Sequence, residues 1–156
     1  MKSRRLRVLH FISNSVESDY FTALVEHTDR ERFELSLGIL EPRRPVTGRD
    51  LITQMDEAGI PVVQLDCERR RHLLSAAWRL ARYLRTHEID VIQTYLFYAS
   101  VVGALAARLS GRTLCAVTGH HCMDILLQRK RFPSFVNRVT NRFLTHYVLA
   151  PTDFVR

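Results

Sequence analysis

The sequence predicts an α/β protein with a doubly wound, mostly parallel, Rossmann-like sheet. Short β-prone apolar runs alternate with helical segments six times along the chain, and Gly, Pro and charged residues separate them. Largely apolar runs of this kind are typical of strands that are buried on both faces of a parallel sheet. Because strict alternation of strand and helix requires right-handed crossovers, we expect helices on both faces of the sheet.

Length and composition fit one domain over residues 1–156, since 46% hydrophobic and 25% charged residues are ordinary for a soluble core. The cysteines, Cys67, Cys115 and Cys122, are odd in number and form no CxxC, so neither a disulfide framework nor a zinc ribbon is indicated. We therefore expect a reducing, cytoplasmic location. The net charge of +7 favours an anionic partner: nucleic acid, an anionic lipid surface or a phosphorylated substrate. Charge alone does not choose among them.

The first strand is expected at Arg7 to Ser13, because RVLHFIS combines β-branched and aromatic residues. The segment follows basic residues like a signal peptide, but it lacks a small-residue cleavage site and contains His10. A helix from Asp19 to His27, capped near Ser18, comes next, and Phe33 to Leu40 forms the second strand. The inward stripe of that helix is expected to be Tyr20, Phe21, Leu24 and Val25.

A loop rich in Pro, Gly and charge leads to a short helix, Asp50 to Ala58, which Gly59 ends. Pro61 to Leu65 is the third strand, and a basic turn precedes a longer helix from Leu73 to His87. The inward positions of that helix are expected to be Leu73, Ala77, Leu80, Ala81 and Leu84, with Arg79, Arg82 and Arg85 in solvent.

The fourth strand is expected at Asp90 to Thr94. The helix after it, Phe97 to Leu109, is apolar nearly all round, so it should be packed on several sides before Gly111 ends it. Thr113 to Thr118 is a buried parallel strand, and it ends at Gly119, His120 and His121. The open end of such a strand is where α/β proteins place their chemistry.

A basic loop, a helix from Ser134 to Leu144 and a last strand, His146 to Ala150, complete the alternation. Residues 151–156 read as the first turn of a further helix with Thr152 as its cap. One helical turn is not stable by itself. The chain is therefore expected to be a fragment of a longer protein or a truncated gene product.

Several common α/β site types are missing from the sequence. The turn after the first strand has no glycine, so both the GxGxxG dinucleotide fingerprint and the phosphate-binding P-loop are absent. Receiver-type signalling domains need clustered acids where Ser13 and Asn14 stand, and no GxSxG elbow of a hydrolase is present. No metal site is predicted, because HxxxH or CxxC spacing is absent around the neighbouring residues His120, His121, Cys122 and Asp124.

The segments RVLHFIS, GIPVVQLD, DVIQTYLFYAS, TLCAVTGHH and YVLAPTDFVR follow one another along essentially the whole chain. In this order they resemble the N-terminal domain of family 4 glycosyltransferases of the GT-B fold. The resemblance implies a two-domain, metal-independent, retaining transferase with a nucleotide-sugar donor. Its N-terminal domain mainly binds the acceptor, and its C-terminal domain holds most donor contacts. That C-terminal domain is absent here, so the chain is expected to be inactive alone.

The resemblance also suggests site residues. His120 matches the family's histidine at the end of the fifth strand, in the interdomain cleft near the transferred sugar, and is the candidate catalytic residue. Imidazole can hydrogen-bond a sugar hydroxyl or, as a cation, stabilise phosphate charge. The other candidates bind substrate: Asn14 and Ser15, where the family usually has two glycines; Tyr95, where many members have a histidine; and His121. The alternatives are a plain turn at Asn14 and Ser15, and histidines that only cap the strand end.

The loop Gln128 to Phe135 (QRKRFPSF) mixes basic and aromatic residues, which suits an anionic membrane surface or a lipid-phosphate acceptor. Arg129 and Lys130 are its candidate substrate-binding residues. The alternative is a solvated loop whose phenylalanines anchor the next helix. No apolar run approaches the roughly 20 residues that a spanning helix needs, so any membrane contact is expected to be peripheral, at the inner face.

The leading hypothesis is thus the acceptor-binding half of a glycosyltransferase in cell-surface glycan or glycolipid synthesis, with a sugar or lipid-linked acceptor. The alternative is a non-catalytic Rossmann-like partner subunit or remnant that needs a separate donor-binding chain. Nucleic-acid binding rests on charge alone, without a recognition helix or RNA motif, and is not predicted.

Overall fold

The computed structural model describes residues 4–14, 19–43, 50–118, 135–136 and 138–149. The described strands form a six-stranded sheet in the order β3-β2-β1-β4-β5-β6, and all neighbouring strands are parallel. The strands are β1 (Leu6–Ile12), β2 (Phe33–Ile39), β3 (Val62–Gln64), β4 (Val91–Tyr95), β5 (Leu114–Thr118) and β6 (Tyr147–Leu149). This sheet confirms the predicted fold class.

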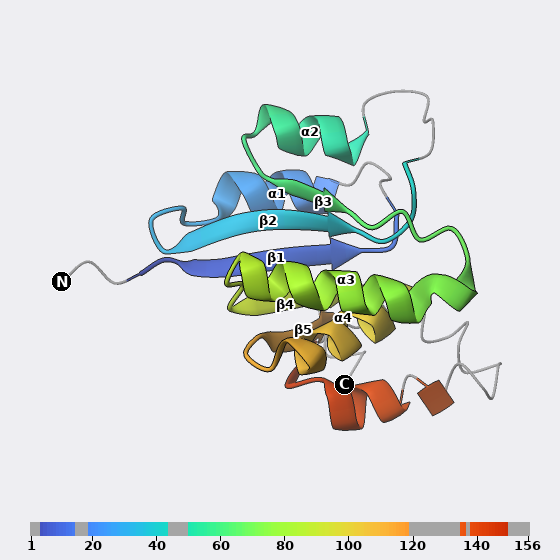
Figure 1. Cartoon of the computed structure of the whole chain (residues 1–156). Coiled ribbons are helices and arrows are strands. Elements are labelled where there is room, and N and C mark those ends of the chain that lie inside the picture. The colour runs from blue at the N-terminus through green and yellow to red at the C-terminus, as the bar shows by residue number, and fades with distance from the viewer. Residues whose placement is uncertain (1–3, 15–18, 44–49, 119–134, 137, 150–156) are drawn as a thin grey trace.

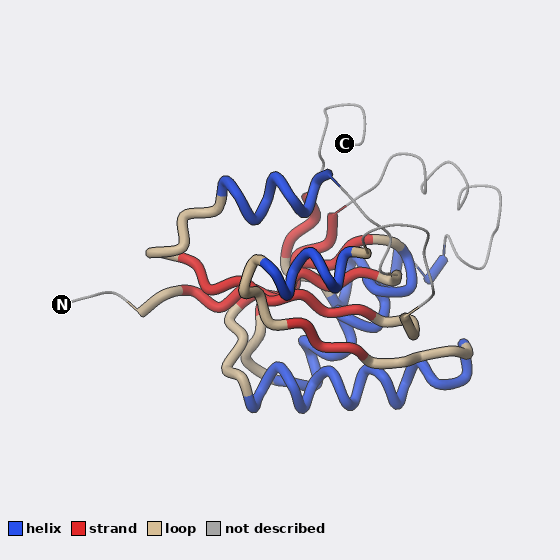
Figure 2. Tube along the Cα trace, turned by 90° about the horizontal axis from the view of Figure 1, so that it is seen from above, coloured by secondary structure: helices blue, strands red, loops and turns tan. Residues whose placement is uncertain are grey.

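Helices lie on both faces of the sheet (Figures 1 and 2). On one face are α1 (Asp19–His27) and α2 (Leu51–Glu57). On the other are α3 (Leu73–Thr86), preceded by the 3-10 turn η1 (Arg70–His72), and α4 (Phe97–Ser110). The π-helical turn η2 (Thr140–Leu144) packs on α4. The predicted strands and the four helices from α1 to α4 are present within the described residues. The predicted helix from Ser134 to Leu144 is described only in part and ends in the π-helical turn η2, while the predicted caps Ser18 and Thr152 and the helical turn 151–156 lie outside the described residues.

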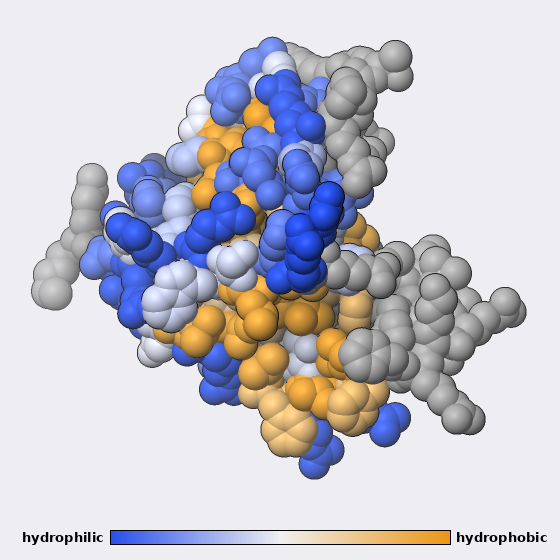
Figure 3. Space-filling view, turned by 45° about the vertical axis from the view of Figure 1, so that its right-hand side comes forward, coloured by the Kyte–Doolittle hydropathy of each residue, from blue (hydrophilic) through white to orange (hydrophobic). Residues whose placement is uncertain are grey.

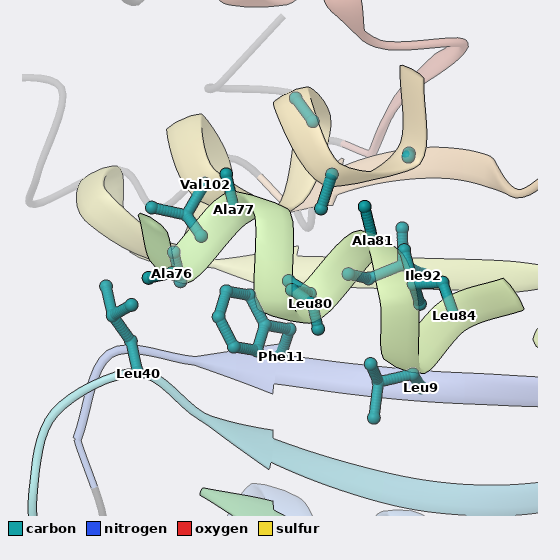
Figure 4. Packing of buried hydrophobic residues seen from close by; sticks show 14 of the residues in the cluster. Leu9, Phe11, Leu40, Ala76, Ala77, Leu80, Ala81, Leu84, Ile92 and Val102 are labelled. Atoms are coloured by element: carbon teal, nitrogen blue, oxygen red, sulfur yellow. The ribbon is translucent and has the colours of Figure 1, made fainter. Parts of the chain in front are cut away.

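The larger core cluster fills the space between the sheet and α3 and α4. Leu9 and Phe11 of β1 are fully buried there, and Figure 4 shows Phe11 beneath Leu80 of α3. Small residues allow a close approach of α4: a Cβ atom added at Gly103 would collide with the side chain of Thr94. The prediction that this helix is packed on several sides is confirmed, since α4 contacts α3, β1, β4, β5 and η2.

A second cluster lies under α1 and α2 on the opposite face, where Phe21, Leu51 and Met55 cover β1 and β2. One predicted inward residue is wrong. Tyr20, in the first turn of α1, is 49% exposed, although its hydroxyl and the edge of its ring contact Tyr95. In α3, Leu73 is only partly buried, and Ala76 is fully buried although the predicted stripe lacks it.

Candidate functional site

The sheet order reverses between β1 and β4, since the chain builds outward from β1 to β3 and then restarts beside β1. In open parallel sheets, ligands bind outside the carboxyl ends of the strands at such a reversal. The carboxyl ends of β1 and β4 are at Ile12 and Tyr95, and the helices α3 and α4 begin at the same edge of the sheet (Figure 1). We call this edge the carboxyl edge.

Hydrogen bonds connect the end of β1 with the start of α4, the helix that follows β4. Leu96, at the N-cap of α4, has φ +68° and offers no side-chain cap to the helix. Ser13, directly after β1, supplies the missing acceptor: the backbone N–H of Ala99 donates to its Oγ at 3.3 Å. The carbonyl of Leu96 accepts from the backbone N–H and the hydroxyl of Ser100. A positive φ is costly for a leucine, so these contacts hold a strained backbone in place.

A buried polar network lies just behind these strand ends, under α1. The hydroxyl of Tyr95 lies 2.8 Å from Nδ1 of His10 and 3.2 Å from the hydroxyl of Tyr20. Burial lowers the pKa of His10 to about 4, and burial together with the contact to Tyr20 raises the pKa of Tyr95. Both groups are therefore neutral near pH 7. The hydroxyl of the half-exposed Tyr20 connects this neutral network to the surface.

A hollow of about 330 Å³ opens at the carboxyl edge, beyond the ends of β2 and β3. Its lining residues are Leu40, Glu41, Pro42, Cys67, Glu68, Arg69, Leu73 and Tyr98. The carboxylates accept hydrogen bonds, the guanidinium donates them, and the tyrosine adds an aromatic surface with a polar tip. Such a mixture suits a small polar ligand that carries many hydroxyl groups.

The thiol of Cys67 lies in the wall of this hollow. Its side chain is buried, and Sγ donates to the carbonyl of Arg69 at 3.6 Å. Burial raises the pKa of this thiol, with a smaller opposing effect of the Arg79 guanidinium. A protonated thiol is a poor nucleophile. Cys67 is therefore not a candidate nucleophile in this hollow.

A model of the glycosyl transferase 4-like domain matches residues 18–156 of the chain. The chain belongs to this family. The match covers most of the sequence, and the family inferred from the order of its motifs is confirmed. A comparison with curated proteins finds no match.

A solved structure of MurG from Acinetobacter baumannii has a similar fold. The TM-score is 0.63 at 16% sequence identity, over 97% of this glycosyl transferase 4-like chain. The chain spans 42% of the length of that MurG chain. The likeness shows the fold, and a match to less than half of a longer GT-B protein fits the N-terminal half of a two-domain architecture.

Two predicted site residues of this glycosyl transferase 4-like domain are described, and both lie at the carboxyl edge. Asn14 is half-buried in the turn after β1, and Tyr95 ends β4 with its hydroxyl in the buried network. The other predicted site residues, Ser15, His120, His121, Arg129 and Lys130, lie outside the described residues. All of these roles stay predictions.

The lining residues of the hollow are not among the predicted site residues. A sequence pattern could have identified two of them, because Glu41 directly follows the expected second strand and Glu68 follows the third within a few residues. Polar residues just past parallel strands are natural site candidates. Tyr98 carries no such signal, since it lies within an apolar helical run.

The described segments lack both a metal-ligand cluster and a membrane-spanning helix. Within them, no group of three or more His, Cys, Asp or Glu side chains is placed to hold a metal ion. None of the described helices is both long enough and apolar enough to cross a bilayer.

Proposed function

We propose that this chain is the acceptor-binding domain of a retaining glycosyltransferase that uses a nucleotide-sugar donor. It acts in the cytoplasm on a cell-surface glycan or glycolipid, and it needs a donor-binding domain for activity. The family match supports the general class, and the likeness to part of a longer GT-B chain supports the role of one domain among two. The observation that carries the acceptor role is the hollow at the carboxyl edge.

In this proposal, the hollow holds a sugar unit of the acceptor. Glu41 and Glu68 accept hydrogen bonds from its hydroxyl groups, and the ring of Tyr98 packs against its less polar face. Tyr98 stands in the first turn of α4, the helix that Ser13 caps from β1. The helix α4 thus connects the proposed sugar site, through Tyr98, with the end of β1, through Ser13.

The proposed catalytic group is His120, which follows the last residue of β5 by two positions in the sequence. The strand β5 itself pairs with β4, which ends at Tyr95. A histidine there can hydrogen-bond the transferred sugar or stabilise phosphate charge. Asn14, Ser15, Tyr95 and His121 are proposed to assist substrate binding. Because most donor contacts belong to a second domain, we propose that the present chain transfers no sugar by itself.

Binding is tested by saturation-transfer NMR with glucose, galactose, mannose, N-acetylglucosamine and their 1-phosphates. We expect at least one of these sugars to bind, and the double variant Glu41→Gln with Glu68→Gln to weaken its binding about tenfold or more, because charge-assisted hydrogen bonds are lost. The matched control, Glu26→Gln with Glu31→Gln, changes two exposed acids away from the hollow and should bind like the parent chain. Equal binding by parent and hollow variant would exclude the hollow as the acceptor site.

Transfer is tested with radiolabelled UDP-, GDP- and ADP-sugars. The chain alone should transfer no label, and a chain that includes the donor-binding domain should transfer it to the acceptor. Activity that appears only when a separate donor-binding chain is mixed in would instead identify the present chain as a partner subunit.

A further inference from the structure

The helical layer on one face of the sheet has an unusual charge pattern. It consists of α3, α4 and residues 138–144, which lie on the same face (Figure 1), and we call it the basic layer. Its sequence contains no Asp or Glu. By contrast, the helices of the opposite face carry the acidic residues Asp19, Glu26, Asp56 and Glu57. The net positive charge of the protein is therefore distributed unevenly between its two faces.

The arginines of the basic layer lie at the protein surface. All of them are exposed: Arg79, Arg82, Arg85, Arg108, Arg138 and Arg142. Within the described part of the chain, none forms an ion pair with a carboxylate. Those that make contacts use neutral partners: Arg79 donates to the carbonyl of Leu65, Arg108 donates to the carbonyl of Phe143, and Arg142 lies over the Phe143 ring. Their charge remains available to an external anionic partner.

Large apolar side chains stand among these arginines. Leu74 and Trp78, one helical turn apart on α3, are 73% and 60% exposed, and Arg82 and Arg85 continue the same stripe. Phe143 in η2 is 61% exposed. Figure 3 shows hydrophobic surface gathered in the lower half of the molecule, beside hydrophilic surface. Exposed apolar groups close to unpaired arginines indicate an interaction surface rather than a merely solvated one.

We propose that the basic layer binds the surface of a membrane that contains anionic lipids. Arginines near such a surface are attracted to lipid headgroups, and tryptophan prefers the boundary between headgroups and acyl chains. The inward face of α3 is buried against the sheet, so only its outer side chains can enter the lipid. The exposed Leu74 favours a lipid surface over nucleic acid, because an aliphatic side chain cannot stack on bases as aromatic ones do but can enter the acyl chains of a lipid.

The carboxyl-edge hollow lies next to the surface that is proposed to bind the membrane. Leu73 and Tyr98, which line the hollow, stand in the first turns of α3 and α4, so the hollow opens at one end of the basic layer. A membrane against this layer would bring lipid headgroups close to the hollow. If the proposed function holds, the acceptor is lipid-linked. Only this last step rests on the proposed function.

The chain contains one tryptophan, Trp78, so its fluorescence reports directly on the proposed surface. The experiment mixes the chain with phosphatidylcholine vesicles that contain 30 mol% phosphatidylglycerol and measures flotation and Trp78 emission. We expect the chain to float with the vesicles, the emission to shift to the blue, and brominated lipid to quench it. Pure phosphatidylcholine vesicles should bind at least tenfold more weakly, and binding should weaken as salt is added.

The double variant Arg82→Gln with Arg85→Gln should bind anionic vesicles about 25-fold more weakly, at about fivefold per arginine. The variant Arg30→Gln with Arg32→Gln removes equal charge outside the basic layer and should bind as the parent does. Absence of vesicle binding would overturn the proposal, as would binding without a blue shift of the Trp78 emission. Equal weakening of vesicle binding by the two double variants would also overturn it. Binding of an oligonucleotide in place of vesicles would assign the surface to nucleic acid. These measurements include no sugar, so they test membrane binding independently of the proposed acceptor role.

Discussion

The hydroxyl of Tyr95, at the end of β4, lies 2.8 Å from Nδ1 of His10 in the neighbouring strand β1. The two rings also stack, with centroids 5.9 Å apart, and the edge of Phe21 from α1 closes over both. The contact places a neutral imidazole within the sheet, close to the edge where the candidate site lies. A buried group of this kind makes stability depend on pH.

We predict that the protein loses stability as the pH falls from about 6.5 to 4. The pKa of His10 is lowered from 6.5 to about 4 in the folded chain, so the unfolded chain takes up a proton first as the pH falls. The contribution is fully present above pH 6.5, and about 3 kcal/mol is lost by pH 4, about 1.4 kcal/mol per pH unit. Urea unfolding at pH 7, 6, 5 and 4.5 measures how the free energy of unfolding depends on pH. The variant His10→Gln should flatten this dependence, and an unchanged slope would show that His10 is not its source.

The variant Tyr95→Phe should lower the free energy of unfolding by about 1 to 3 kcal/mol, because it leaves Nδ1 of His10 without its partner inside the protein. Tyr20→Phe is the matched control. It removes a hydroxyl from the same network at a half-exposed position, where water can replace it, so the loss should be below about 1 kcal/mol. Equal losses in the two variants would contradict the buried-network account.

Gly103→Ala should destabilise the protein by about 1 to 3 kcal/mol, even though alanine is the better helix former by about 1 kcal/mol. The new Cβ atom would collide with Thr94, so α4 would have to move away from β4. Combining it with Thr94→Ser, which removes the opposing methyl group, should recover part of the loss in a double-mutant cycle. A stabilised Gly103→Ala variant would show that α4 does not lie so close to the sheet.

Asp50→Ala should cost about 1 to 2 kcal/mol, because this buried carboxylate caps α2. It accepts from the backbone N–H and hydroxyl of Thr53 and from the guanidinium of Arg43. Asp56→Ala, at an exposed position of the same helix, should change thermal unfolding little. If the two variants melt alike, the cap contributes no measurable stability.

The succession of elements was predictable because it depends on local patterns. The apolar runs and the helical spacing in α3 give the order of strands and helices to within a residue or two at most ends, and strict alternation gives the doubly wound sheet. Tyr20 was wrongly predicted to be buried, since helical spacing gives the face on which a residue lies but not how deeply the first turn of the helix is covered.

The site was less predictable because its contacts join residues far apart in the sequence. Ser13 caps a helix that begins more than eighty residues later, and no pattern near either residue indicates this bond. Leu96 adopts a positive φ with no glycine to signal it. The hollow combines the ends of β2 and β3 with the starts of α3 and α4, so its residues are brought together only by the folded sheet.

The central claim is that the carboxyl-edge hollow binds the acceptor sugar, and amide chemical-shift mapping tests it most directly. The labelled chain is titrated with whichever sugar gives the strongest saturation transfer. We predict that the largest shifts fall at Glu41, Glu68, Leu73 and Tyr98. The protein also has a hollow of about 210 Å³ near the opposite ends of β2 and β3, lined by Arg30, Phe33 and Gly59 among others. Shifts confined to that second hollow, or the absence of shifts at the first, would contradict the account.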